Sequence, residues 1–528
     1  MKTQNTPATV STQNPTTPSP EGKRIRFPVD PFTTIVPLFV ILLFCALFLA
    51  VPDGSANVLK SIRTFLENRL GVYYLAVGLG MLVLALGTAF SRIGNIVLGK
   101  PGEKPAHGFL AWGGMLFTAG LAADILFYSF CEWILYAGES RVAELGSMQD
   151  WASTFPLFHW GPIPWSFYAM LAACFGFMIH VRGVRKQKYS EACRPLLGRF
   201  TDKAPGKAID VLAVFALVAG TATTFSLATP LLAAAISDLF GVKATNLLSI
   251  GILLATCALY TNSVVHGMRG IKFLSQLCMA LFLGLLAYVF AFGGRPVYIL
   301  ETGFAAIGNM LQHFIGLSTY TDPLRTTGFA QNWTIFYWAY WMVWCVAAPF
   351  FMGGISRGRT VRQVILGSLF FGLAATLVSF VVLGNYSLGL QMSGELDVLA
   401  LYGANEDLYQ TILAVIHTLP ASPVVSVLLV VSMIAFYATS FDSITLVASA
   451  YSYREIAAGK EASLSMKLFW AVLLILLPVV LLFNESSMNN LQTVSMIAAF
   501  PIGLVILLIV FSFLKDARSL LGQTGSRR

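Results

Sequence analysis

A dense aromatic run near the middle of the chain holds the side chains with the most specific chemistry. The run, WTIFYWAYWMVW, has seven aromatic residues in the twelve positions from 333 to 344. Spacings of i, i+4, i+7 and i+11 place four rings on one helix face, namely Trp333, Tyr337, Tyr340 and Trp344. Two more rings flank that face, Phe336 and Trp341. Core packing or an interfacial belt would explain one or two such rings. A stripe of three turns favours a cage for a quaternary ammonium, which cannot donate a hydrogen bond and is attracted to π faces.

The helix that carries these rings is predicted to be interrupted. Pro349, Gly353 and Gly354 weaken it, and the residues SRGR at 356–359 end it in a basic turn. A broken helix in a membrane is tolerated where it lines a cavity, typically on a substrate path.

Asp124 is the most informative single residue outside the aromatic run. It lies in the apolar stretch MLFTAGLAADILFYSFCEW, and a carboxylate in a bilayer is costly enough to be a functional candidate. Beside a cage it would favour a substrate with net positive charge, and it could instead be the titrating group of proton coupling. A hydrogen-bonded structural aspartate is the alternative. Glu132, two turns further along, is expected to have a structural or gating role.

Two further clusters could contribute to a site. The sequence FHWGPIPWSFY at 158–168 supplies three rings, either to a central site or to the membrane interface, namely Trp160, Trp165 and Tyr168. The sequence FYATSFDS at 436–443 contains Thr439 and Ser440. Their hydroxyl groups could bond back to helix carbonyls, or they could bind a hard cation such as Na⁺.

WTIFYWAYWMVW followed by ISRGRTVR closely resembles the signature of the betaine/choline/carnitine transporter (BCCT) family, and weaker similarity covers most of residues 30–518. The resemblance implies transport of quaternary ammonium compounds by a LeuT-like fold with two inverted five-helix repeats, assembled as a homotrimer. It implies that the rings at 160, 165 and 168 line the central site beside the cage. The family's sodium site implies Na⁺ as a coupling ion, with ligands at Thr118, Leu121, Phe436, Thr439 and Ser440.

Departures from the family pattern bear on the substrate. The family's glycine-rich run is replaced by GLAADILFYS, so Ala122, Asp124 and Ser129 stand at three expected glycines. Choline importers of the family tend to have an aspartate here, so the resemblance favours choline over glycine betaine. WASTFPLFHWGPIPW and FAQNWTIFYW look especially like the sodium-independent carnitine antiporters. Cys278 and Ala348, however, stand where that branch has an arginine and a methionine, which argues against simple carnitine exchange. Choline, glycine betaine and carnitine stay open, as do Na⁺ coupling, H⁺ coupling and exchange.

Composition sets the class of protein. The 528 residues are 56% hydrophobic and 11% charged, with a mean hydropathy of +0.73. A soluble domain cannot bury so much apolar surface, so we expect an all-α polytopic membrane protein. Topology explains the net charge of +9, and no nucleic-acid partner is implied.

No motif in the sequence indicates catalysis. The seven cysteines and six histidines form no zinc or disulfide pattern, no Walker A loop is present, and no nucleophile–base constellation indicates an enzyme. The expected partners are therefore a small quaternary ammonium molecule and membrane lipid, with no cofactor besides the coupling ion. An osmosensor or receptor on a transporter fold is the alternative of another class.

Twelve spans are predicted, at 32–51, 71–91, 108–137, 163–181, 208–237, 245–262, 271–292, 331–354, 362–386, 420–449, 466–483 and 491–514. Basic residues gather in the loops after spans 2, 4, 8 and 10, and acidic residues in those after spans 3 and 9. This asymmetry predicts a multi-pass protein of the bacterial inner membrane with both termini in the cytoplasm. The loop at 52–70 is the exception, with Lys60, Arg63 and Arg69.

The predicted organisation follows from these spans. It comprises a disordered tail (1–31), two N-terminal helices (32–107), a first five-helix repeat (108–292), an outer amphipathic helix and loop (293–330), a second five-helix repeat (331–514) and a short tail (515–528).

Overall fold

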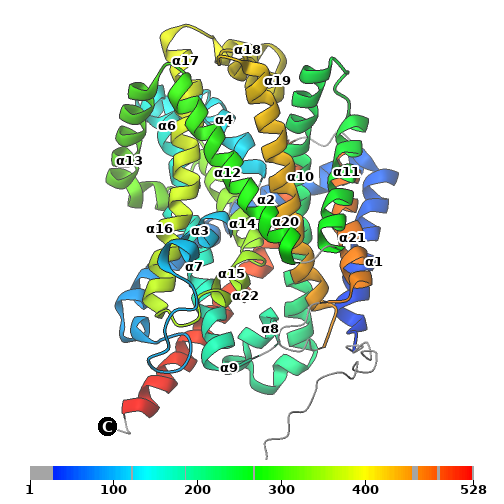
Figure 1. The fold of residues 1–528 in the computed structure, drawn as a ribbon, viewed down its shortest axis with the longest axis vertical. Helices are drawn as coiled ribbons and strands as arrows, with labels where there is room; N and C mark the ends of the chain where they lie inside the picture. The colour runs from blue at the N-terminus through cyan, green and yellow to red at the C-terminus, as the bar shows by residue number, and fades with distance from the viewer. Residues whose placement is uncertain are drawn as a thin grey trace, which may run out of the picture.

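The computed structural model describes residues 28–119, 123–184, 186–265, 268–454, 462–483 and 488–525. Over these ranges the regular structure is helical (Figure 1), apart from two isolated backbone bridges, Val29 with Tyr453 and Val97 with Thr360. Residues 1–27 of the predicted tail and the predicted sodium ligand Leu121 lie outside the described residues.

The helices run the length of the chain. Those before residue 293 are α1 (Pro31–Ala50), α2 (Pro52–Phe90), α3 (Phe109–Ala119), α4 (Ala123–Ala137), α5 (Ser140–Leu145), α6 (Met148–His159), α7 (Pro162–Gly176), α8 (Tyr189–Ala192), α9 (Arg194–Leu197), α10 (Ala204–Phe240), α11 (Asn246–Val265) and α12 (Met268–Phe292). Those after it are α13 (Pro296–Thr319), α14 (Ile335–Trp344), α15 (Ala348–Gly354), α16 (Val361–Ser379), α17 (Asn385–Ser393), α18 (Val398–Asn405), α19 (Leu408–His417), α20 (Ser422–Tyr451), α21 (Leu464–Phe483) and α22 (Met488–Gly525). Short 3-10 turns are η1 (Arg92–Asn95) and η3 (Gly198–Asp202), and π-helical turns are η2 (Phe177–Val181), η4 (Ala330–Thr334) and η5 (Phe380–Gly384).

Many of these helices could cross a membrane. Among the described residues, eight helices are long and apolar enough, and the number rises to eleven if each of three bent pairs counts as one span. The bent pairs are α3 with α4 (68°), α12 with α13 (113°) and α14 with α15 (54°). An all-helical, multi-pass architecture is therefore confirmed, whereas twelve spans, inverted repeats and the predicted segment boundaries stay predictions.

The loop predicted at 52–70 is wrong, because α2 already begins at Pro52. Arg63 lies inside this helix, where its Nε donates to Glu67 Oε1 at 2.5 Å. Its guanidinium also donates to Gln492 Oε1 of α22 at 3.3 Å. This arginine, which departs from the charge pattern of the other loops, therefore belongs to a buried ion pair within α2 that also bonds to α22, rather than to a solvated loop.

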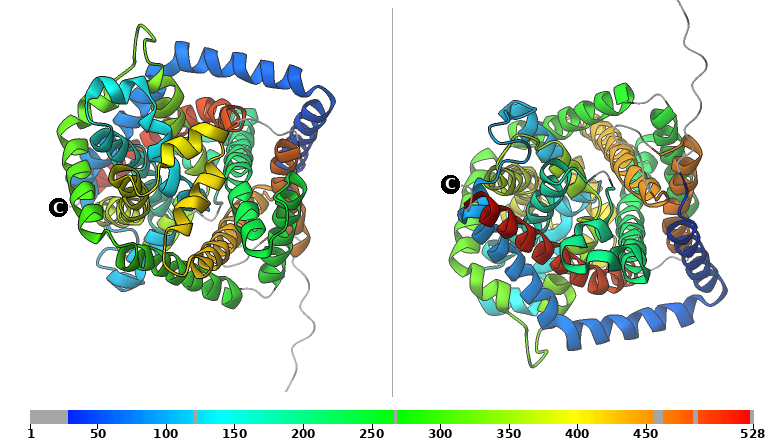
Figure 2. Two further views of the ribbon diagram at one scale, coloured as in Figure 1. Left: turned by 90° about the horizontal axis from the view of Figure 1, so that it is seen from above. Right: turned by 90° about the horizontal axis from the view of Figure 1, so that it is seen from below.

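Helices at the edge of the bundle and helices near its middle are similarly apolar, but they differ in how many of their residues are buried. In the most apolar window of α10, 89% of the residues are buried inside the protein, against 28% for α1. Figure 2 shows α1 and the first part of α2 at the edge of the bundle and α10 nearer its middle. Since all three helices are strongly apolar, α1 and α2 present hydrophobic side chains outwards, as a membrane requires.

The interruption predicted in the aromatic helix is confirmed. The helix α14 ends at Trp344, and α15 starts again at Ala348 with Pro349 in its first turn, where proline needs no hydrogen-bond partner. The second half-helix then packs directly on α7. A Cβ added to Gly353 would lie 2.6 Å from the Gly176 nitrogen, so this backbone-to-backbone approach requires glycine.

Candidate functional site

Four aromatic rings from two elements pack together at the centre of the bundle. The ring centroid of Trp341, on α14, lies 5.4 Å from that of Trp160, 5.6 Å from that of Trp165 and 5.4 Å from that of Tyr168. All four side chains are buried. The three rings around Trp341 come from the junction of α6 and α7, so one tight turn of the chain supplies most of this cluster.

Local sequence explains that turn. Trp160 ends α6, and a Cβ on Gly161 would lie 2.3 Å from the Leu157 carbonyl oxygen, so only glycine fits there. Thr376 of α16 then fixes both tryptophans. Its hydroxyl donates to the Trp160 carbonyl at 2.9 Å and accepts from Trp165 Nε1 at 3.2 Å.

A buried hydrogen-bond chain holds the Trp160 indole. Trp160 Nε1 donates to Glu132 Oε2 at 2.6 Å, and the Tyr136 hydroxyl donates to Glu132 Oε1 at 2.5 Å. Tyr136 also bonds to His159 Nδ1 at 2.7 Å, and His159 Nε2 lies 3.0 Å from the Thr334 hydroxyl. The Glu132 carboxylate therefore fixes the orientation of the Trp160 indole, and it affects the ring cluster through this hydrogen bond.

Asp124 lies in the first turn of α4, just after the bend between α3 and α4. The Tyr340 hydroxyl, on α14, donates to Asp124 Oδ2 and also shares a hydrogen bond with the hydroxyl of Thr224 on α10. The Thr224 hydroxyl lies 3.4 Å from the same carboxylate oxygen. One carboxylate oxygen is thus held by two helices, while Asp124 Oδ1 is buried and has no hydrogen-bond partner in the part of the chain that the structure describes.

Two other buried polar atoms in this region, the indole nitrogens of Trp341 and Trp344, have no hydrogen-bond partner among the described residues. An unsatisfied buried polar group costs about 1–3 kcal/mol, so native proteins leave few of them without a reason. Their concentration around the Asp124 and Trp341 side chains is the mark of a site that receives a polar or charged molecule.

Comparison with known proteins decides the family. The sequence model described as betaine/carnitine/choline family transporter matches residues 32–521. The chain belongs to the betaine/carnitine/choline transporter family. The glycine betaine transporter OpuD of Bacillus subtilis is 32% identical over 473 residues, covering 88% of this chain and 90% of that relative. A glycine betaine transporter of Acinetobacter baylyi is 28% identical over 498 residues, covering 93% of this chain and 74% of that relative. The family resemblance of the sequence is therefore confirmed.

In this BCCT transporter, the predicted aromatic stripe does not converge on a single point. Trp333 donates to Glu139 Oε1 at 2.6 Å and packs at the far end of the helix, whereas Tyr337 stacks on His159 with centroids 4.8 Å apart. The π-helical turn η4 contains Trp333 and adds a residue to its turn, which shifts the register expected from 3.6-residue spacing.

The two flanking rings lie in different surroundings. Trp341 lies in the ring cluster, while Phe336 packs between Tyr337 and Tyr340, with centroids 5.0 and 5.5 Å away. Trp344 neighbours Tyr340 at 6.4 Å. The rings of the stripe therefore lie one after another along the length of the site. The role of each ring in substrate binding stays a prediction.

Of the two hydroxyl groups at 439 and 440, the Thr439 hydroxyl shows the back-bonded arrangement that is the alternative to cation binding. The Thr118 hydroxyl donates to the Gly114 carbonyl at 3.1 Å, and the Thr439 hydroxyl donates to the Phe436 carbonyl at 3.0 Å. Each hydroxyl oxygen keeps lone pairs, and Ser440, the residue after Thr439, is buried, so these positions hold oxygen atoms of the kind that a hard cation binds. Na⁺ binding by these residues stays a prediction.

Sequence reasoning missed two residues that touch the site. Thr224 bonds Tyr340 at the Asp124 carboxylate, and Thr376 bonds both Trp160 and Trp165. A signal for the first was present, because the polar stretch GTATT at 220–224 interrupts an otherwise apolar helix. Nothing in the sequence indicates a role for Thr376, because a lone threonine in an apolar helix usually bonds to its own backbone.

Proposed function

We propose that this BCCT transporter is a secondary active transporter that carries a quaternary ammonium compound across the bacterial inner membrane by alternating access. The observation that supports this most directly is the cluster of Trp341, Trp160, Trp165 and Tyr168, with ring centroids 5.4–5.6 Å apart. Aromatic faces attract a methylated cation by up to about 2 kcal/mol per ring once water is excluded. Because the rings touch one another, the headgroup enters between them when the helices move apart.

The proposed substrate has a net positive charge, as choline does. Asp124 supports this choice, because its buried Oδ1 has no partner and Tyr340 links its other oxygen to the aromatic helix. A buried anion next to a cation cage attracts choline and repels the carboxylate of glycine betaine. The curated relatives carry the name glycine betaine transporter, so glycine betaine is the main competitor.

The proposed coupling is symport with Na⁺ or H⁺. Oxygen atoms at Thr118, Thr439 and Ser440 would hold Na⁺, and Asp124 is the group available to carry a proton within the membrane. We further propose twelve spans in a LeuT-like fold, both termini in the cytoplasm and a homotrimer. The bends between α3 and α4 and between α14 and α15 support the fold, because one broken helix in each half is typical of inverted repeats.

Uptake into proteoliposomes tests this proposal. Purified protein is reconstituted, and radiolabelled choline, glycine betaine and carnitine are supplied under a Na⁺ gradient, a pH gradient, both or neither. We expect choline to reach the highest internal concentration of the three compounds. We expect it to accumulate only when a Na⁺ gradient or a pH gradient is present. Accumulation of none of the three compounds under any gradient would refute the proposal. Preferred uptake of glycine betaine would refute the role given to Asp124.

Exchange without ion coupling is the second candidate, because WASTFPLFHWGPIPW and FAQNWTIFYW look especially like the carnitine antiporters. Proteoliposomes preloaded with unlabelled carnitine distinguish it. An antiporter takes up labelled carnitine or betaine only against internal substrate, whereas a symporter also fills empty vesicles when the ion gradient is present.

A further inference from the structure

The connection between α7 and α10 contains three residues that are unusually buried for a loop. It runs along the end of the bundle where the C-terminal part of α22 lies (Figure 1). Lys188 is 3% exposed, and Tyr189 and Ser190, which begin α8, are fully buried. Connecting segments normally lie on the surface and lysine is almost never fully buried unless paired, so this burial needs a reason.

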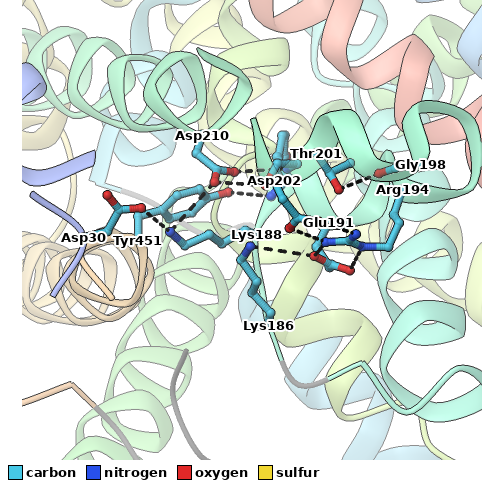
Figure 3. Close-up of polar contacts among 12 residues, drawn as sticks. Asp30, Lys186, Lys188, Glu191, Arg194, Gly198, Thr201, Asp202, Asp210 and Tyr451 are labelled. Carbon is cyan, nitrogen blue, oxygen red and sulfur yellow. Dashed lines mark hydrogen bonds and ion pairs between the residues drawn. The ribbon is translucent and has the colours of Figure 1, made fainter. Parts of the chain in front are cut away.

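Lys188 joins three helices that are far apart in sequence (Figure 3). Its Nζ lies 3.8 Å from Asp30 Oδ2, at the start of α1, and 3.8 Å from Asp210 Oδ2, in α10. It also lies 5.9 Å from the ring centroid of Tyr451, at the end of α20. Burial lowers the pKa of the Lys188 ammonium, and the two carboxylates act in the opposite direction. This cation therefore stays in place only while its acidic partners surround it.

The next two residues bond to the same helices. The Tyr189 backbone N–H donates to the Tyr451 hydroxyl at 3.1 Å. Ser190 donates twice to the Asp210 carboxylate, from its backbone N–H at 3.1 Å and from its hydroxyl at 2.9 Å. The segment 188–190 is thus attached to α1, α10 and α20.

The Tyr189 side chain reaches in the other direction, to the break in the aromatic helix. Its hydroxyl donates to the Cys345 carbonyl at 2.8 Å, one residue beyond Trp344, where the end of α14 leaves carbonyls without helical partners. Its ring lies 5.8 Å from Phe350 of α15 and 5.3 Å from Phe175 of α7. The segment therefore binds both the broken helix and the helices opposite it.

Alternating access would break one of these two attachments. The half-helix α15 packs on α7, which packs on α16, whereas α10 packs on α20 and α21 and also contacts α14 and α22. Alternating access moves one group of helices against the other around the site. A segment bonded to α10 and α20 on one side and to the α14–α15 break on the other must release one of them when the groups separate.

We propose that segment 188–190 closes the route from the aromatic site towards the end of the bundle that carries α22, and that Lys188 is the positioning residue that keeps Tyr189 at the Cys345 carbonyl. The inference rests on the proposed transport function. Opening towards this end requires the Tyr189–Cys345 hydrogen bond to break while the Lys188 ion pairs hold the segment on α1 and α10. Closing restores the bond.

Cys345 provides a reporter, because its side chain is fully buried and Tyr189 bonds to its own carbonyl. Full-length protein is labelled with a membrane-impermeant maleimide in inside-out and in right-side-out vesicles. A Cys193→Ser background removes the thiol that lies three residues after segment 188–190. Tyr189→Phe removes only the hydroxyl group. We expect it to raise the labelling rate of Cys345 about five-fold in one vesicle orientation, the factor that corresponds to one ordinary hydrogen bond.

Lys188→Met and Lys186→Met form a matched pair in the same loop. Lys186 is partly exposed, and the ion pair that it forms among the described residues, with Glu191 at 3.8 Å, does not involve segment 188–190, so its loss leaves the segment in place. We expect Lys188→Met to accelerate labelling of Cys345 and Lys186→Met to leave it unchanged. Cys345→Ser identifies the labelled site.

Transport kinetics distinguish a change in the opening of the site from a general loss of stability. A protein held open towards one side offers fewer sites to the other, so Tyr189→Phe should raise the apparent KM measured from the opposite side while the Tm stays unchanged. Wild-type labelling rates of Cys345 in both Tyr189→Phe and Lys188→Met would overturn the proposal. Labelling needs no substrate, so a failure of the uptake assay refutes the transport function and leaves this comparison intact.

Discussion

Two neighbouring tryptophans on α14 allow a sharp test of the aromatic site. Trp338 and Trp341 are both buried, and the indole nitrogen of each has no hydrogen-bond partner. They lie three residues apart, which turns their side chains about 60° from each other around the helix. Trp341 points into the cluster formed with α6 and α7. Trp338 packs on Phe158 and His159 of α6, outside the four-ring cluster, and on Gly78 of α2, where a Cβ would lie 2.7 Å from its ring.

Replacement of each by leucine should separate binding from stability. A cation that loses one desolvated ring loses about 2 kcal/mol, so Trp341→Leu should raise the Kd for choline about thirty-fold. Trp338→Leu should leave that Kd within about a factor of three, because its ring faces away from the cluster. Both changes leave a cavity in a packed interior, so both should lower the Tm.

The measurement is equilibrium binding of radiolabelled choline to purified protein, with Tm measured on the same samples. A Tm that falls in both variants while the Kd rises only for Trp341→Leu is the expected result. If Trp338→Leu weakens binding as much as Trp341→Leu, the loss reflects general damage to α14. If Trp341→Leu leaves the Kd unchanged, the cluster is not the cation site.

Three further outcomes follow from the described contacts. Asp124→Asn keeps the shape and removes the charge, so it should reduce choline uptake at least about ten-fold while sparing glycine betaine, as measured by competition in proteoliposomes. Replacing Thr439 and Ser440 together by alanine should abolish stimulation of uptake by Na⁺, and unchanged Na⁺ dependence would rule these oxygens out as ligands. In the loop after α13, burial acts to raise the pKa of the Asp322 carboxyl, but hydrogen bonds led by the backbone N–H groups of 326–328 prevail and lower it to about 2. That stabilisation is complete above the unfolded pKa of about 3.9 and is lost as the pH falls through about 2. Asp322→Asn should therefore lower the Tm at pH 7, and the difference from wild type should narrow as the pH is lowered from 5 towards 2.

The sequence predicted those features of the fold that depend on local composition. Apolar runs identify membrane-spanning helices whatever their neighbours, and Pro349 together with two nearby glycines indicates a weak point in the helix. Asp124 was singled out for the same reason, since a carboxylate in an apolar helix is conspicuous without any tertiary information.

Features that depend on register and on distant partners could not be predicted. The stripe from Trp333 to Trp344 assumes a regular helix, and the π-helical turn at 330–334 changes the register of its first ring. The bond between Trp160 and Glu132 joins residues 28 positions apart, and the bond between Tyr340 and Asp124 joins residues 216 apart. Nothing in either local sequence indicates the partner.

The bond between Tyr340 and Asp124 also explains why the polar and aromatic parts of the site coincide. Asp124 lies in the first turn of α4, the second helix of one bent pair, and Tyr340 precedes the break of the other pair by one turn. The end of α14 leaves backbone carbonyls without helical partners, and such groups stabilise polar side chains at a depth where they are otherwise costly. The two interruptions therefore meet at one point, and the tyrosine hydroxyl joins them. Because Tyr340 links the two interrupted helices, relative movement of these helices changes its hydrogen bond to Asp124. Loss of the Tyr340 hydroxyl should therefore alter both the substrate preference and the opening of the site.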